Sequence, residues 1–180
     1  MTSTLEIIIT FVFQLACMLF LIRFLLQASG ADFYNPISQA IVKGTDPLCS
    51  PLRAIMPRTG QFDLASLLLA WLIATAGLFA ITFVKYGVLA PIGPALWRGF
   101  IDMLLVLTQF YWFTILIVII ASFIAQGNYH PALQLLSQLL EPLLAPIRKI
   151  MPDFGPIDLS PMVLILIIIV VENLLRQAAG

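Results

Sequence analysis

The sequence has few ionisable side chains. Of its 180 residues, nine are Lys or Arg and nine are Asp or Glu, so the formal net charge is zero and charged residues make up only 10%. Proteins that bind nucleic acid directly carry basic patches that neutralise phosphates. The basic residues here form nothing larger than short pairs, so direct nucleic-acid binding is not expected.

Histidine and cysteine are equally scarce. His130 is the only histidine, and Cys17 and Cys49 are the only cysteines. These residues cannot supply a zinc site, a haem-attachment pair or a disulfide framework. A Ser-His-Asp arrangement has only one histidine to draw on, and the glycines form no phosphate-binding loop. The sequence therefore predicts no metal, no cofactor and no enzymatic activity.

Apolar residues, by contrast, dominate the chain. Hydrophobic residues make up 61%, and the mean hydropathy is +1.05. Crossing a bilayer takes roughly 20 apolar residues in a helix, and the backbone must be helical because lipid offers it no hydrogen bonds. Four stretches fit this requirement, at residues 7–26, 64–84, 101–125 and 159–175. We expect an all-α membrane protein with four transmembrane helices, whose partners include the lipid bilayer.

One segment occurs twice. Residues 34–64 align without a gap with residues 129–159, ninety-five positions later, which indicates a tandem duplication. We therefore predict a first repeat over 1–86, a linker over 87–99 and a second repeat over 100–180. We expect the first helix to be retained rather than cleaved as a signal, because its counterpart is an internal helix and no basic residue precedes it.

The repeats are expected to have the same orientation. Each consists of a helix, a connection and a helix, so an even number of crossings separates equivalent points and the pseudo-twofold axis runs along the membrane normal. Both connections then lie on one face of the membrane. The basic residues expected on that face are Arg23, Lys43, Arg53, Arg58, Arg148 and Lys149. Those on the other face are Lys85, Arg98 and Arg176. The positive-inside rule places the connections in the cytoplasm and both termini outside.

The first half of each connection has the pattern of an amphipathic helix. Its polar positions, spaced four and then three apart, are Gln39, Lys43 and Asp46 in the first repeat and Gln134, Gln138 and Glu141 in the second. That spacing defines one face of a helix. The helix is expected either to lie at the membrane surface or to pack over the end of the bundle.

Prolines and a glycine follow at repeated positions. These positions are Pro47, Pro51, Pro57 and Gly60 in the first repeat, and Pro142, Pro146, Pro152 and Gly155 in the second. The second proline of each set is predicted to restart the chain as a short helix, since proline is favoured at the first helical position. The third proline is predicted to end that helix, and the glycine to supply a turn. The expected result is a stiff, broken connection that is only partly helical.

A repeated arginine and aspartate complete the motif. Asp63 and Asp158 precede apolar stretches, where an aspartate N-cap is favoured. They are alternatively ion-pair partners of Arg53 and Arg148, either within each repeat or crossed between repeats near the axis. Four such charges brought together would form an ion-interaction site or a docking surface. The arginines are otherwise expected to extend toward lipid phosphates and anchor the fold.

Other polar and small residues lie within the apolar stretches. Gln14 and Gln109 are also ninety-five positions apart. They are expected to hydrogen-bond to each other or to a neighbouring helix, or alternatively to line a small permeation path. Arg98 with Asp102, and Glu172 with Arg176, have the spacing of ion pairs on a helix. Small residues at Ala70, Ala74, Gly77 and Ala80 indicate a face on which another helix packs closely.

The duplicated motif resembles that of a known family. Its pattern, Pro-x3-Pro-x-Arg-x-Ile-Met-Pro-x2-Gly-x2-Asp-Leu between two apolar helices, is similar to that of the YggT family, called YlmG in some lineages. The resemblance implies a small multi-pass protein of the bacterial inner membrane without established catalytic activity. Family members are linked to osmotic or ionic stress and to the neighbourhood of cell-division genes. Plastid relatives are linked to cytochrome b6 assembly and to nucleoid distribution.

Two functional hypotheses follow. The first is a membrane scaffold or assembly factor that uses the motif face to dock partners or to order nearby helices. The expected partner is a membrane protein, or the protein associates with itself. The second is a small ion channel or transporter-like protein, with Gln14, Gln109 and the Arg/Asp set along its path. In either case we expect both copies of the motif to take part.

Overall fold

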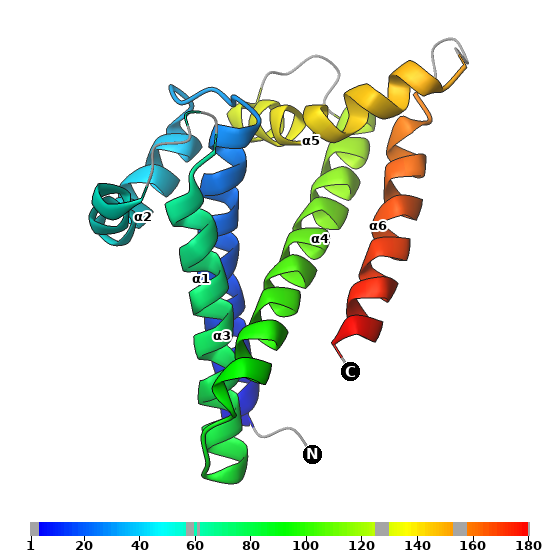
Figure 1. The fold of residues 1–180 in the computed structure, drawn as a ribbon. Helices are drawn as coiled ribbons and strands as arrows, with labels where there is room; N and C mark the ends of the chain where they lie inside the picture. Colours follow the sequence, from blue (N-terminus) through cyan, green and yellow to red (C-terminus); the bar gives the residue numbers. More distant parts are fainter. Residues whose placement is uncertain (1–3, 57–59, 61, 125–129, 153–157, 180) are drawn as a thin grey trace.

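The structure, a computed structural model, describes residues 4–56, 60, 62–124, 130–152 and 158–179. All six elements formed by these residues are α-helices (Figure 1). They are α1 (Thr4–Ala28), α2 (Pro36–Ile55), α3 (Leu64–Tyr86), α4 (Ile92–Ile124), α5 (Pro131–Ile150) and α6 (Ser160–Ala178). Helices α1, α3, α4 and α6 are long and apolar enough to cross a membrane. The prediction of an all-α protein with four candidate spans is confirmed.

The four candidate spans form two pairs, α1 with α3 and α4 with α6, and the contact between α3 and α4 joins the pairs. In Figure 1, α1 and α3 lie side by side, and α4 meets α3 near the end opposite to α2 and α5. Helix α6 lies along α4, and the marked chain ends lie away from α2 and α5. One apolar cluster joins α1, α3 and α4 around Leu21 and Met103. Another joins α4, α5 and α6 around Ile115 and Leu164.

The helix bounds follow the sequence repeat closely. Helices α2 and α5 begin and end at equivalent positions, 36–55 and 131–150. Each has an N-cap side chain that accepts a backbone N–H: Asn35 from Ile37 and His130 from Ala132. Helix α4 begins at Ile92, so residues 92–99 of the predicted linker are helical.

The two connecting helices lie near one end of the spans, α5 against α4 and α6 and α2 beside α1 and α3 (Figure 1). Helix α5 buries Leu135 and Leu139 against the end of α1 and the middle of α4, and Leu140 and Leu144 against α4 and α6. The N-terminal parts of α2 and α5 also contact each other, because Asn35 Nδ2 donates to the Pro131 carbonyl over 2.8 Å. Both helices thus contact the spans, and the expected placement at the membrane surface stays a prediction.

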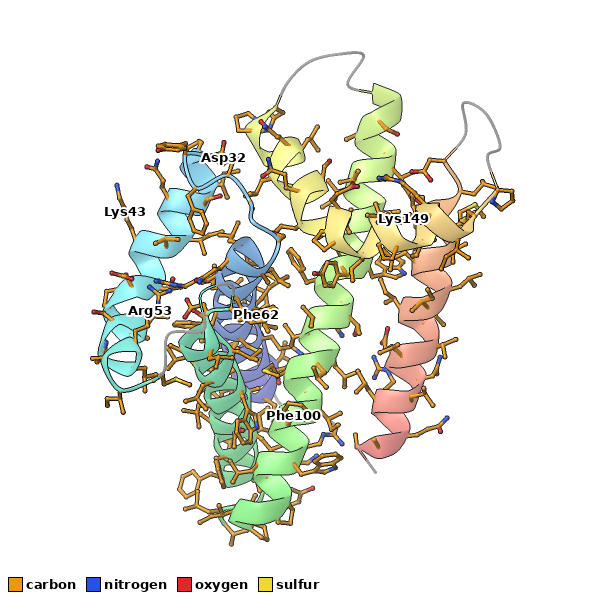
Figure 2. All side chains as sticks on the ribbon, turned by 45° about the horizontal axis from the view of Figure 1, so that its top comes forward. Asp32, Lys43, Arg53, Phe62, Phe100 and Lys149 are labelled. Carbon is orange, nitrogen blue, oxygen red and sulfur yellow. The ribbon has the colours of Figure 1, made fainter. Side chains whose placement is uncertain are left out.

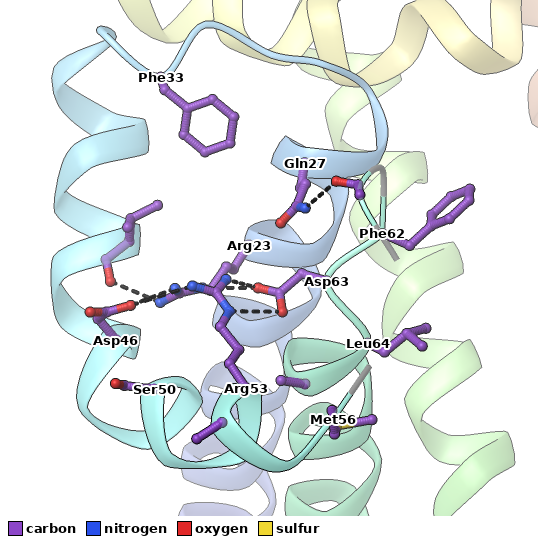
Figure 3. A pocket seen from close by; sticks show the side chains of 14 residues that line it. Arg23, Gln27, Phe33, Asp46, Ser50, Arg53, Met56, Phe62, Asp63 and Leu64 are labelled. Carbon is purple, nitrogen blue, oxygen red and sulfur yellow. Dashed lines mark hydrogen bonds and ion pairs between the residues drawn. The ribbon is translucent and has the colours of Figure 1, made fainter. Parts of the chain in front are cut away.

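The expected break at the internal prolines is wrong. Helix α2 continues through Pro47 and Pro51, and α5 continues through Pro142 and Pro146. A proline deprives the carbonyl four residues earlier of its partner, but Lys43 and Pro47, which carry those carbonyls in α2, are exposed. The prolines therefore bend α2 and do not end it. The helix changes direction between the turns carrying Asp46 and Arg53 (Figure 3).

The helices end where the third proline was expected to stop them. Met56 and Met151, directly before Pro57 and Pro152, are extended, with ψ of 146° and 142°. Gly60 has a φ of 57°, which fits the predicted turn because glycine tolerates the left-handed region. Three residues named from the sequence, Pro57, Arg58 and Gly155, lie outside the described residues.

The small-residue face of α3 packs against α1. Ala70 is fully buried, and a Cβ added at Gly77 would lie only 2.8 Å from Phe13 Cβ of α1. The expectation of a close-packing face is confirmed in α3. The equivalent positions of α6 carry large side chains: Ile165, Ile169, Glu172 and Leu175.

Candidate functional site

Arg23 of α1 is the centre of a buried polar cluster. Its side chain is 2% exposed. Its Nε donates to Asp63 Oδ2 over 3.3 Å, and its Nη2 donates to Asp46 Oδ1 over 2.7 Å. Its Nη1 donates to the Val42 carbonyl over 2.9 Å and to Thr45 Oγ1 over 2.7 Å. A single guanidinium thus joins α1 to α2 and to the start of α3.

Asp63 performs both roles expected for it. It is the N-cap of α3, and its side chain accepts the Ser66 backbone N–H and the Ser66 hydroxyl. It also accepts hydrogen bonds from Arg53, whose Nε lies 3.2 Å from Asp63 Oδ1 and whose Nη2 pairs with Oδ2. Burial raises the pKa of Asp63, but hydrogen bonds from Arg53 and Ser66 outweigh it, and the net pKa is lowered. The 3% exposed carboxylate therefore stays ionised between two arginines.

Asp46 and Arg53 form an outer layer over this buried pair. Their side chains are 53% and 41% exposed, and Arg53 Nη1 lies 3.6 Å from Asp46 Oδ1. The hydrogen bond from Arg23 lowers the pKa of Asp46, and the hydrogen bond to Asp63 raises the pKa of Arg53. Figure 2 shows Arg53 directed toward the start of α3, near Phe62, whereas Lys43 points away from the molecule.

The cluster lines a hollow of about 660 Å³ between α1, α2 and the start of α3. Figure 3 shows Arg23, Asp46, Arg53 and Asp63 meeting along one wall of it. Apolar side chains line other parts of the hollow: Phe33, Met56, Phe62 and Leu64. The site therefore places charges of both signs beside apolar surface at one end of the candidate spans.

The second repeat forms a simpler and more exposed cluster. Arg148 Nη1 donates to both oxygens of Glu141, over 2.9 and 3.1 Å, and Arg148 Nη2 lies 3.0 Å from Asp158 Oδ2. The three side chains are between 42% and 57% exposed. The Arg–Asp pairs thus form within each repeat, and the crossed pairing is not observed.

Asp158 differs from Asp63 at the following helix. The N-cap of α6 is Leu159, which makes no side-chain capping bond, so the expected N-cap at Asp158 is displaced by one residue. Asp158 Oδ1 instead accepts the backbone N–H and the hydroxyl of Ser160. The bond from the Ser160 hydroxyl is the main cause of the lowered pKa of Asp158.

The buried part of the first cluster has no equivalent among the residues of the second repeat that the structure describes. The positions matching Arg23, Thr45 and Cys49 carry Val118, Leu140 and Leu144. These apolar residues belong to the core between α4, α5 and α6. The role of Arg23 was not predicted, because from the sequence this residue counted only as a basic charge on one face. The available signal was an arginine within an apolar stretch, which requires a partner.

Gln14 and Gln109 lie at a separate hollow of about 270 Å³ between α1, α3, α4 and α6. Among the described residues no hydrogen bond joins the two amides, so the mutual bond considered from the sequence is not formed. Arg98, Asp102 and Arg176 also line this hollow. The predicted Arg98–Asp102 and Glu172–Arg176 ion pairs are confirmed, at 3.0 and 2.6 Å.

Comparison with known proteins gives matches over most of the chain. The CCB3/YggT family model matches residues 2–84 and again residues 97–179. The chain is 43% identical to an uncharacterized protein of Pseudomonas aeruginosa, over 82% of this chain and 76% of that protein. It is 37% identical to the uncharacterized protein YggT of Escherichia coli strain K12, over 94% of this chain and 88% of that protein. No solved structure matches it.

Proposed function

The chain belongs to the CCB3/YggT family, and from that premise we propose that it is a non-enzymatic scaffold or assembly factor of the bacterial inner membrane. Its two repeats cross the membrane in the same orientation, with α2 and α5 on the cytoplasmic side and both termini outside. Its partner is another membrane protein. We place this role in the response to osmotic or ionic stress.

One observation carries the proposal: α2 and α5 lie at the same end of the spans and present matching exposed residues. Ile55 and Ile150 occupy equivalent positions at the ends of these helices and are 84% and 86% exposed. Ile55 lies two residues after Arg53, and Ile150 lies two residues after Arg148. Each of these arginines donates a hydrogen bond to the aspartate that precedes the next span. An exposed aliphatic side chain beside a held charge suits a docking contact, in which apolar burial supplies affinity and the charge supplies orientation.

Photocrosslinking in native membranes tests this proposal. A photoreactive residue replaces Ile55, Ile150 or, as a control, Phe11, which is 64% exposed on α1 and is expected to face lipid. We expect discrete protein adducts from positions 55 and 150 and only lipid adducts from position 11. Adducts limited to lipid or to the protein itself at all three positions would count against a protein-docking scaffold.

A second candidate function is ion permeation, favoured by the hollow that Gln14 and Gln109 share. In this proposal the two amides and the Arg98–Asp102 pair would contact a permeating ion. Ion flux into proteoliposomes should then fall in the Gln14→Leu/Gln109→Leu double variant. The Arg53→Ala/Arg148→Ala variant tests whether the motif clusters also lie on the path. Wild-type flux no greater than that of empty liposomes, for folded protein, would exclude this candidate.

A further inference from the structure

The hollow beside Arg23 has the chemistry of a binding site for a zwitterion. Its buried layer, Arg23 and Asp63, is held by hydrogen bonds on several sides. Its outer layer, Asp46 and Arg53, keeps about half of its side-chain surface exposed, at 53% and 41%. The outer layer therefore offers one anion and one cation side by side, and the buried layer holds both in place.

Charge balance decides which class of ligand fits. The charges of two arginines and two aspartates sum to zero. An anion is therefore attracted by Arg53 but repelled by Asp46, and a cation is attracted by Asp46 but repelled by Arg53. A ligand that carries one positive and one negative charge can form a favourable ion pair with each of the two side chains. A phosphate suits the guanidinium, and a primary ammonium suits the carboxylate because it can donate hydrogen bonds. A quaternary ammonium has no N–H to donate.

The position of the hollow indicates a lipid as the source of that ligand. Arg23 lies five residues before the end of α1 at Ala28, which corresponds to roughly 7.5 Å along the helix. A ligand bound this close to the end of a membrane-crossing helix would meet the headgroup region beside the apolar core. Phe33 and Phe62 are 49% and 47% exposed and line the same hollow, with Phe33 above the charges and Phe62 to their right in the view of Figure 3. Both can contact the glycerol and the upper acyl chains of a lipid.

We propose that this hollow binds a zwitterionic phospholipid with a primary-amine headgroup, of the phosphatidylethanolamine type, with its phosphate at Arg53 and its ammonium at Asp46. The described residues of the second repeat form no equivalent site. Its Arg148 cluster lacks the buried arginine, and Leu140 and Leu144 occupy core positions where the first repeat has Thr45 and Cys49.

Lipid retention by purified protein tests the proposal without reference to any protein partner. Delipidated wild-type protein in detergent is offered phosphatidylethanolamine, phosphatidylcholine and phosphatidylglycerol with identical acyl chains, and bound lipid is counted by native mass spectrometry. We expect about a tenfold preference for phosphatidylethanolamine, as one charge-assisted hydrogen bond would supply. Equal retention of the three lipids, or a preference for phosphatidylglycerol, would overturn the proposal.

Matched variants locate the site. Asp46→Asn retains a side-chain oxygen to accept from Arg23 but removes the charge, and should abolish the preference. Glu141→Gln makes the equivalent change in the second repeat and should leave the preference intact. Folded Asp46→Asn protein that keeps the preference, or a loss in Glu141→Gln, would place the site elsewhere and refute the assignment.

A soluble analogue separates the two possible sources of the ligand. Glycerophosphoethanolamine is a phosphodiester and carries the same two charges without acyl chains. We expect it to leave the melting temperature unchanged at concentrations where phosphatidylethanolamine raises it. Stabilisation by the soluble compound, with none by the lipid, would overturn the lipid assignment.

Discussion

The same Arg–Asp pair has very different surroundings in the two repeats. In the first repeat it is completed by Arg23, and Asp63 is 3% exposed; in the second, Arg148 and Asp158 are 42% and 46% exposed. The motif has the same arginine and aspartate in both repeats, so the motif does not cause the difference in the exposure of the aspartate. It arises outside the motif, where Arg23 of α1 is matched by Val118 of α4. A duplicated motif can thus hold a buried site in one repeat and a surface ion pair in the other.

The spans of the two repeats differ in a related way. Helix α3 brings small residues to α1, and Gly77 allows the close approach of Phe13. Helix α6 has Glu172 at the matching position, where it pairs with Arg176 instead. Close helix contact and buried charge therefore occur together in the first repeat. The second repeat relies on the apolar core between α4, α5 and α6.

The largest expected effect comes from breaking the buried cluster. Arg23→Gln leaves Asp63 buried with fewer partners and should destabilise the protein by about 3–5 kcal/mol. Arg148→Gln removes exposed pairs only and should cost about 0–1 kcal/mol. Denaturant titration of both variants in detergent measures the difference. Similar losses in the two variants would show that the repeats are energetically equivalent.

A smaller effect is expected at the close contact between α1 and α3. Gly77→Ala places a Cβ against Phe13, and overpacking of this kind costs about 1–3 kcal/mol. Gly44→Ala is the control, because a Cβ there meets nothing within 4 Å in α2. It should be neutral or stabilising by up to about 1 kcal/mol. Thermal melting compares the two, and equal behaviour would argue against the close contact.

Acid stability should also separate the repeats. The pKa of Asp63 is lowered in the folded protein, so its carboxylate contributes stability above its unfolded pKa of about 3.9 and loses it as the pH falls through the folded pKa. Arg53→Gln removes the main cause that lowers this pKa while burial still raises it, so acid unfolding should begin at higher pH.

Arg148→Gln is the matched control for that shift. The Ser160 hydroxyl, which is the main cause of the lowered Asp158 pKa, remains in this variant. Its acid transition should therefore move less. Circular dichroism between pH 7 and pH 3 follows both transitions. A larger shift in Arg148→Gln would contradict the assignment of the buried carboxylate to the first repeat.

The smallest effect is expected from salt. The ion pairs of the second repeat are exposed, and the Debye length falls from about 10 Å at 0.1 M to about 3 Å at 1 M salt. The destabilisation caused by Arg148→Gln should disappear over this range, whereas that caused by Arg23→Gln should persist. Melting curves at the two salt concentrations test this, and a salt-sensitive loss in Arg23→Gln would mean that the cluster is open to solvent.

Several features were predictable because they depend on local patterns. The apolar stretches predicted the four candidate spans, and the residue before Pro57 or Pro152 is extended as proline requires. The Arg53–Asp63 ion pair was one of the two pairings expected from the sequence, within each repeat or crossed between the repeats. The N-cap at Asp63 was predicted as well. The continuity of α2 was not predicted, because proline propensity says nothing about whether the carbonyls it leaves unpaired lie on an exposed side.

The sequence by itself determined the helical class, the four apolar candidate spans and the duplication, since hydropathy and repetition are properties of neighbouring and aligned residues. Only the tertiary structure decided that Arg23 lies against Asp46 and Asp63, which are 23 and 40 positions away in the chain. The physical reason is that a buried charge requires partners that converge on it from several helices. That convergence depends on how α1, α2 and α3 pack together, and an arginine in an apolar stretch signals only that partners must exist.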